Sequence, residues 1–271
     1  LVRPGDSDVA KRSTIVASIL KEVRTGGDEA IRDLSIRFEG NASENLMVTQ
    51  SEMEQAAQIL PEALKAAIQQ AYQNISGFHS SQWEPVQKVE TMPGVTCWRK
   101  SIPIGRVGLY IPGGTAPLFS TVLMLGIPAQ LAGCQQVILC TPAQKDGTVH
   151  PAILFAASLC GIGQIFKVGG AQAIGAMAYG TETIPKVWKI FGPGNPWVTT
   201  AKQLVSLDGI AIDLPAGPSE VCVVADASAH PEFVAADLLS QAEHGSDSQV
   251  LLISNDETLI SRVEEALETQ L

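Results

Sequence analysis

The chain has 271 residues, of which 45% are hydrophobic and 17% are charged, and its formal net charge at pH 7 is −10. An acidic chain without a segment rich in Lys or Arg is not expected to bind nucleic acid, because phosphates attract a basic surface. The apolar content is typical of a globular protein with one large domain or two smaller ones.

Cysteine usage and apolar runs predict a cytoplasmic protein that does not enter a membrane. The five cysteines are odd in number, include no C-x-x-C pair and lie mostly in apolar segments. We therefore expect reduced core residues rather than a disulfide framework. The longest apolar run, 117–134, is interrupted by Ser, Thr, Gly, Pro and Gln, so it is not expected to span a membrane. We also expect no signal peptide.

Residues 8–80 carry the periodicity of helices and no pattern that suggests chemistry. The apolar stripe of the first helix ends at Gly26-Gly27, and Asp28 is placed to cap a second helix. A capping box is predicted at 51–54, because Ser51 and Glu54 have the required spacing. Another helical pattern covers 61–79. A scaffold role is the simplest interpretation of this region.

From residue 86 onward the pattern changes to strands. A hairpin is predicted over 86–101, with Pro93-Gly94 at its turn. Five short apolar segments then predict buried strands, at 107–111, 136–140, 165–168, 187–191 and 210–213, separated by helical patterns at 117–132, 150–160, 171–179 and 197–206. This alternation predicts a parallel sheet with helices on both faces.

A shorter series follows, with strands at 220–225 and 250–253 and helices at 231–244 and 257–271. Two strands are too few for a stable open sheet, so we expect their partners elsewhere. The chain begins with Leu rather than Met, and its last helical pattern still continues at residue 271. Both observations suggest a fragment of a longer polypeptide.

Loops rich in glycine and proline follow the predicted strands, at 110–117, 169–173, 192–196 and 214–220. Open α/β sheets bind ligands beyond the carboxyl ends of their strands, and the next helix offers N–H groups to an anion. The loops therefore suit a phosphate or a dinucleotide. However, no G-x-G-x-x-G occurs, so ordinary turn chemistry is the alternative.

Single residues in these loops also have structural explanations. Tyr110 could be a half-buried aromatic with its hydroxyl in water, and Gln172 a solvated polar group. Asn195 could cap a helix that begins at Pro196. Four acidic residues nearby could be catalytic, but their spacing selects none of them: Asp213, Glu220, Asp237 and Glu243.

Gln241 and His244 are three residues apart at the end of a helical pattern, which places both on one face. An amide oxygen and an imidazole are half of a zinc or substrate site. The other three histidines lack metal-like spacing. Either this is not a metal site or its other half lies outside the chain. Alternatively, His244 is only a favourable residue at a helix C-terminus.

Five segments, taken together and in order, resemble the histidinol dehydrogenase family: 108–125, 168–174, 189–195, 213–220 and 238–245. The resemblance implies NAD-dependent oxidation of L-histidinol to L-histidine in two steps, through an aldehyde that stays in the site. This is the last step of histidine biosynthesis. It also implies a zinc-dependent homodimer when the protein has its full length, with no nucleic-acid or membrane partner.

The fold expected on this basis is α/β, with two doubly wound Rossmann-like parallel-sheet domains and an N-terminal helical segment, the second domain being incomplete. We expect residues 1–106 to form helices and a hairpin that pack with 219–271. Residues 107–218 would form an NAD-binding-like domain, and 219–271 the start of the second domain.

The resemblance also assigns roles to individual residues. Tyr110, Gln172 and Asn195 would contact NAD, Ser219 would contact the substrate, and both zinc and substrate would be bound by Gln241 and His244. The family's Glu-His acid-base pair and its other zinc ligands lie further along the sequence, so we expect no catalytic residue in this chain and no activity from it alone. The alternatives are a non-catalytic nucleotide-binding or interaction module, and a related zinc and NAD dehydrogenase of another amino alcohol or sulfonate.

Overall fold

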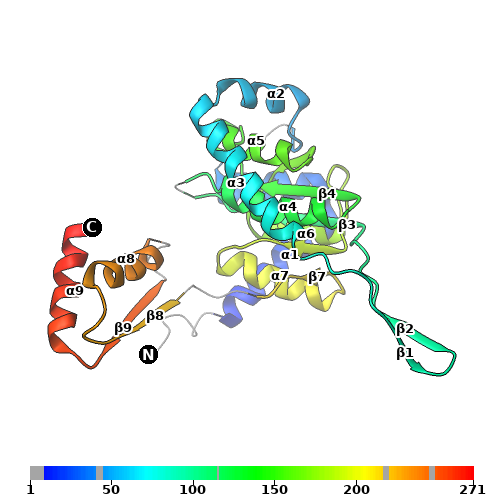
Figure 1. Cartoon of the computed structure of the whole chain (residues 1–271). Coiled ribbons are helices and arrows are strands. Elements are labelled where there is room, and N and C mark those ends of the chain that lie inside the picture. Colours follow the sequence, from blue (N-terminus) through cyan, green and yellow to red (C-terminus); the bar gives the residue numbers. More distant parts are fainter. Residues whose placement is uncertain (1–8, 41–44, 115, 216–219, 244–247) are drawn as a thin grey trace. The chain divides into compact units, whose positions relative to one another are not determined.

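The computed structural model describes residues 9–40, 45–114, 116–215, 220–243 and 248–271 (Figure 1). The chain divides into two compact units, with the boundary between Pro215 and Ala216. No helix within these ranges is both long enough and apolar enough to cross a membrane.

The first unit is built on a parallel sheet of five strands: β3 (Arg106–Tyr110), β4 (Gln136–Thr141), β5 (Gln164–Lys167), β6 (Lys189–Phe191) and β7 (Ala211–Ile212). Their order is β5-β4-β3-β6-β7, and every neighbouring pair is parallel. The chain starts in the centre at β3, moves outward on one side and returns to the other. The direction therefore reverses between β3 and β6, which is where open α/β sheets bind ligands.

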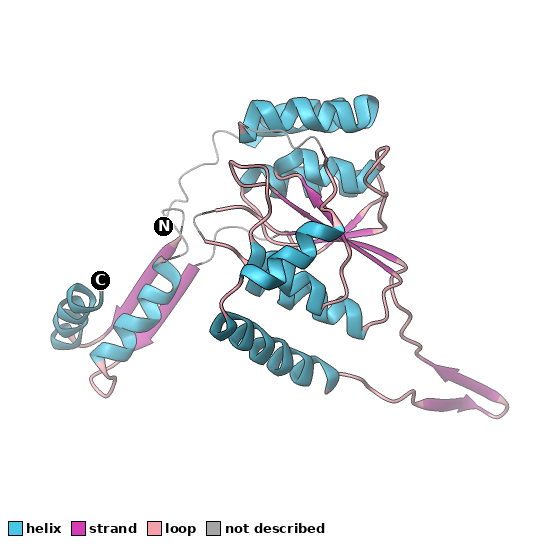
Figure 2. Ribbon diagram, turned by 90° about the horizontal axis from the view of Figure 1, so that it is seen from above, coloured by secondary structure: helices cyan, strands magenta, loops and turns pink. Residues whose placement is uncertain are grey.

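Alternating side chains of the strands supply two separate cores, one on each face of the sheet. Tyr110 and Cys140 belong to one core, whereas Leu109 and Leu139 belong to the other. The first core is covered by α1 (Val9–Glu39), α6 (Gly170–Tyr179) and α7 (Pro196–Leu207), and the second by α2 (Gln50–Ile59), α3 (Glu62–Ser80), α4 (Phe119–Leu131) and α5 (Pro151–Leu159). Figure 2 shows helices on both sides of these strands, as the sequence predicted.

Helix α1 is kinked at Gly27, whose φ is 55°, so the predicted break falls at the correct residue. The predicted cap at Asp28 is wrong. The Asp28 carboxylate instead accepts hydrogen bonds from the hydroxyls of Thr181 and Thr183. The Asp28 N–H donates to Glu182 Oε2 at 2.8 Å. The hydrogen-bonding groups of Asp28 at the kink are therefore paired with a loop that is distant in sequence. The local sequence pattern cannot reveal such a contact.

The capping box of α2 is present but begins two residues before the predicted position. Thr49 Oγ1 accepts from the Glu52 N–H at 3.2 Å, and Glu52 Oε2 accepts from the Thr49 N–H at 2.8 Å. Thr49 and Glu52 have the same spacing as the predicted Ser51 and Glu54. The sequence pattern alone did not distinguish these two pairs.

The predicted hairpin is confirmed as β1 (Lys88–Met92) and β2 (Val95–Trp98), which are antiparallel and exposed. The N-terminal helices contact the helices of the five-stranded sheet: α1 contacts α6 and α7, α2 contacts α5, and α3 contacts α4. These helices thus belong to the first unit, whereas a separate region was predicted over 1–106. Packing of that region with 219–271 stays a prediction.

The described residues of the second unit form two parallel strands, β8 (Glu220–Ala225) and β9 (Gln249–Ser254), and two helices, α8 (Pro231–Ala242) and α9 (Glu257–Gln270). The predicted order of strand, helix, strand and helix is confirmed. Buried side chains of the two helices form its small core, namely Val234, Ala235, Leu238, Leu259 and Val263.

Candidate functional site

The loops at the carboxyl edge of the five-stranded sheet are packed against one another. A Cβ built on Gly113, after β3, would lie 2.6 Å from Pro142 Cγ. A Cβ built on Gly169, after β5, would lie 2.7 Å from Pro142 Cβ. Pro142 itself follows β4, so three strand-end loops meet at this proline. The absence of a side chain at the two glycines permits this close approach.

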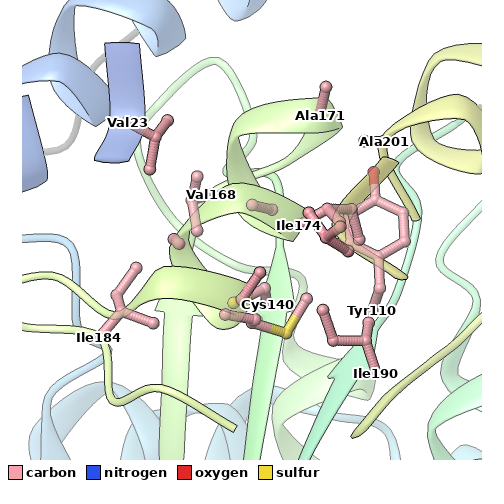
Figure 3. Close-up of a cluster of buried hydrophobic side chains, with 14 of the residues drawn as sticks. Val23, Tyr110, Cys140, Val168, Ala171, Ile174, Ile184, Ile190 and Ala201 are labelled. Carbon is pink, nitrogen blue, oxygen red and sulfur yellow. The ribbon is translucent and has the colours of Figure 1, made fainter. Parts of the chain in front are cut away.

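Tyr110 ends β3 and is only 3% exposed. Its phenol oxygen accepts a hydrogen bond from the Gly170 N–H at 3.0 Å. The ring lies in the same apolar cluster as Val168, Ala171 and Ile174 (Figure 3). Burial raises the pKa of the Tyr110 phenol. The alternative of a hydroxyl in water is wrong, because the residue is buried and its hydroxyl accepts from Gly170.

Gln172 lies in the first turn of α6 and is 2% exposed, so it is not a solvated polar group. Its Nε2 donates to Glu39 Oε1 at 2.8 Å. The same oxygen accepts from the Gly169 N–H at 3.1 Å. Burial raises the pKa of Glu39, and these two hydrogen bonds offset part of the shift. Glu39 thereby joins the end of α1 to the start of α6.

Glu39 was not predicted as a site residue. One local signal was available, because a carboxylate at the last residue of a helix lies at the negative end of the helix dipole. Such an unfavourable position suggests that the carboxylate has a partner elsewhere. The identity of that partner depends on a contact between residues far apart in sequence.

Asn195 caps α7, as predicted from the sequence. Its Oδ1 accepts from the N–H groups of Trp197 at 3.1 Å and Val198 at 3.0 Å. The Asn195 residue itself is exposed, at the end of the loop that follows β6. It therefore lies in a neighbouring loop at the same edge of the sheet as Tyr110 and Gln172.

Two charged residues hold the loop that carries Asn195. Asp213 Oδ2 accepts from the Gly192 N–H at 2.7 Å, and Lys202 Nζ donates to the Gly192 carbonyl at 2.8 Å. Lys202 and Asp213 also form an ion pair. Gly192 has a φ of 133° and lies against the Tyr110 backbone, where a side chain would overlap with the carbonyl oxygen. The loops that follow β3 and β6 are thus held together.

The start of α4 differs from the starts of α6 and α7. Gly169 and Gly170 at the start of α6 donate to side chains, and Asn195 caps α7. In contrast, Leu118 provides no side-chain cap for α4. The preceding Gly113 and Gly114 are exposed. Among these three helices, α4 therefore has the N-terminus best suited to an added anion.

The substrate and metal residues predicted for the second unit are described only in part. Gln241 is half-buried in the last turn of α8, and its Nε2 donates to Ser248 Oγ at 3.3 Å. Ser219 and His244 lie outside the described residues, so the shared helix face of Gln241 and His244 stays a prediction. Within the described ranges, no three His, Cys, Asp or Glu side chains form a cluster that could hold a metal ion.

Comparison with known proteins gives a consistent match over nearly the whole chain. The family model described as histidinol dehydrogenase matches residues 3–271. A histidinol dehydrogenase of Bacteroides fragilis strain YCH46 is 60% identical over 94% of this chain. One from Xanthomonas axonopodis pv. citri strain 306 is 54% identical over 100% of it.

The fold agrees with these sequence matches. The crystal structure of histidinol dehydrogenase from Elizabethkingia anophelis superposes with a TM-score of 0.91 at 48% identity, covering 100% of this chain and 65% of that one. The chain spans 60% of the Bacteroides relative and 63% of the Xanthomonas relative. On the match of its sequence and of its fold, the chain belongs to the histidinol dehydrogenase family.

Proposed function

We propose that this protein serves the NAD-dependent oxidation of L-histidinol to L-histidine through histidinal, the last step of histidine biosynthesis. One observation carries the proposal. Tyr110 ends β3 at the carboxyl edge of the sheet, where the strand order reverses, and its hydroxyl accepts from Gly170, two residues before Gln172. That edge is the usual binding place for a dinucleotide in an open α/β sheet.

The described residues fit NAD without a Rossmann glycine fingerprint. Gly113 and Gly114 are exposed before an α4 N-terminus without a side-chain cap, and a Cβ on Gly114 would meet nothing within 4 Å. Backbone N–H groups there could bind a phosphate. Tyr110, Gln172 and the exposed Asn195 would contact other parts of the cofactor. When bound, NAD supplies the acceptor for the hydride.

Zinc is the second cofactor that the proposal includes. The Gln241 amide oxygen and the His244 imidazole are ligand types that zinc accepts, and two ligands do not complete a four-coordinate site. Together with Ser219, they would hold the substrate in one orientation. Orientation is important for hydride transfer, because the donor carbon and the nicotinamide must meet closely.

The remaining zinc ligands and the acid-base pair would come from sequence beyond these 271 residues, one ligand from a second subunit. We therefore expect the 271-residue chain to show no turnover, and a homodimer of family length to be active. The test measures reduced nicotinamide formed from L-histidinol by both polypeptides. Turnover by the shorter chain alone would contradict the incomplete site, and inactivity of the longer polypeptide on L-histidinol would contradict the proposed substrate.

Two substitutions in the longer polypeptide test the assigned roles. Gln172→Ala should raise KM for NAD far more than KM for histidinol, and equal increases would contradict a cofactor contact. His244→Ala should lower both zinc content and activity. If His244 is only a helix-end residue, its loss would reduce stability by at most ~2 kcal/mol and leave the zinc content unchanged.

A further inference from the structure

Glu39 has no role in the proposed chemistry, yet it is the side chain that holds Gln172. Its Oε1 accepts from Gln172 Nε2 at 2.8 Å and from the Gly169 N–H at 3.1 Å. A single oxygen atom therefore fixes both a buried side chain and the backbone at the start of α6. Gln172 is 2% exposed, and Glu39 Oε1 is the acceptor that the structure gives for its Nε2.

The position of Glu39 is unfavourable for its own helix and favourable for α6. It is the last residue of α1, where the helix dipole disfavours a negative charge. Its carboxylate meets the N-terminus of α6, where the dipole favours one. The position of the Glu39 carboxylate is thus favoured by the dipole of α6 and not by that of α1.

The amide of Gln172 is held close to the backbone that binds Tyr110. Gly170 has a φ of 61°, and a Cβ built there would lie 2.7 Å from Gln172 Oε1. The Gly170 N–H donates to the Tyr110 hydroxyl at 3.0 Å. Glu39 and Tyr110 therefore accept from the successive backbone N–H groups of Gly169 and Gly170. Glu39 also accepts from the Gln172 amide, which lies beside Gly170.

We propose that Glu39 is a positioning residue for the dinucleotide, which acts by fixing the side-chain amide of Gln172. The inference rests on the proposed function, because it assumes that Gln172 contacts NAD. Without the carboxylate, Gln172 loses the acceptor of its Nε2, and the amide rotates freely or turns toward other donors and acceptors. NAD must then restore its orientation on binding, which weakens affinity.

The experiment measures the dissociation constant of NAD by calorimetry on the 271-residue chain. Glu39→Ala should weaken binding about tenfold, which corresponds to the loss of a hydrogen bond to a charged group. Glu39→Gln should stay within about threefold of the wild type, because its amide oxygen can accept from the same two donors. Glu29→Ala, an exposed α1 residue, is the matched control and should have no effect.

A double-mutant cycle separates positioning from a general structural effect. If Glu39 acts through Gln172, the double variant Glu39→Ala/Gln172→Ala should bind NAD no more weakly than Gln172→Ala alone. If Glu39→Ala does not fold, Glu39→Asp replaces it in the cycle, because its shorter side chain cannot reach both donors.

The outcomes distinguish the two proposals. Additive losses in the cycle, or a loss with Glu39→Gln as large as with Glu39→Ala, would overturn positioning while leaving NAD binding intact. An unchanged affinity in Glu39→Ala would also overturn it. Failure of the wild-type chain to bind NAD would overturn the inference together with the cofactor site on which it rests.

Discussion

The two parallel sheets of this chain differ in how completely their strands are covered. In the first unit, both faces of β4 pack against apolar cores, and Leu139 in that strand is 0% exposed. In the second unit, the described residues of β8 and β9 are half-buried or exposed, and Leu251 is 38% exposed. Parallel sheets in folded proteins usually have both faces covered.

The two sheets also differ in how many side-chain contacts hold the loops at the ends of their strands. Helices on opposite faces of the first sheet send Glu39 and Glu52 to the same end of β5, where they contact Gly169 and Lys167. In the described part of the second unit, the side chain of Gln241 has one hydrogen bond, to Ser248. Side chains at the edge of a fully covered sheet are therefore preorganised by residues from several elements.

The largest expected effect compares equivalent leucines in the two sheets. Leu139→Ala should lower the free energy of unfolding of the first unit by about 4 kcal/mol, because it leaves a cavity in a packed core. Leu251→Ala should reduce stability by about 1 kcal/mol or less, since much of that side chain is exposed.

Urea titration can distinguish the two units, because all four tryptophans (Trp83, Trp98, Trp188 and Trp197) belong to the first. Tryptophan fluorescence should thus shift with Leu139→Ala and stay unchanged with Leu251→Ala, while circular dichroism follows both units. Equal losses for the two leucines would show that the open face of β9 is covered in solution.

The next prediction concerns the contact between the β3 and β6 loops. Gly192→Ala should lower stability by about 3 kcal/mol, because a methyl group there overlaps with the Tyr110 carbonyl and the φ of 133° is strained for alanine. Gly114→Ala is the control, since its Cβ would meet nothing within 4 Å and its φ lies outside the positive region. Thermal unfolding followed by fluorescence measures both variants, and similar losses would contradict the described contact.

A smaller loss is expected from the ion pair that holds the same loop. Lys202 is 5% exposed, and Lys202→Met leaves Asp213 without its cation, which should lower stability by about 2 kcal/mol. Arg99→Ala, which removes an exposed pair with Glu84, should change it by less than about 0.5 kcal/mol. The double variant Lys202→Met/Asp213→Asn should recover part of the stability that Lys202→Met loses. If the double variant is instead about 2 kcal/mol less stable than Lys202→Met, the unpaired charge of Asp213 is not the cause.

Much of this architecture could be predicted from local sequence. Alternating strand and helix patterns predicted the parallel sheet, and Asn195 before Pro196 predicted the cap of α7. Both features depend on residues that are close in sequence. The capping box was shifted because two pairs share one spacing. Strand order could not be derived, since nothing local specifies which strands become neighbours.

The anchors of the candidate site were beyond local reasoning for the same reason. Glu39 meets Gln172, and Lys202 meets Gly192, only after helices and strands have packed. The resemblance identified residues expected to touch ligands, but it did not identify the side chains that support them. Its roles for Ser219 and His244 stay predictions, because both residues lie outside the described part of the chain.

The smallest effects concern the pH dependence of the two glutamates that meet the end of β5. Burial raises the pKa of Glu39 above its ordinary value of 4.5. The folded state therefore binds this proton more tightly than the unfolded chain does. The contribution of Glu39 to the free energy of unfolding is fully present below pH 4.5, and it is lost as the pH rises through the folded-state pKa. Glu39→Gln should match the wild type in acid and become the more stable protein at neutral pH.

Glu52 should show the opposite behaviour. Burial alone would raise its pKa, but hydrogen bonds from Lys167 and Thr49 lower it below 4.5. Its stabilising contribution is present above pH 4.5 and is lost as the pH falls through the folded-state pKa. Glu52→Gln should therefore be less stable than the wild type at neutral pH and approach it in acid. Urea titrations across this range measure both gaps. If both Gln variants were more stable than the wild type at neutral pH, or both less stable, the predicted opposite effects of the Glu39 and Glu52 charges would be contradicted.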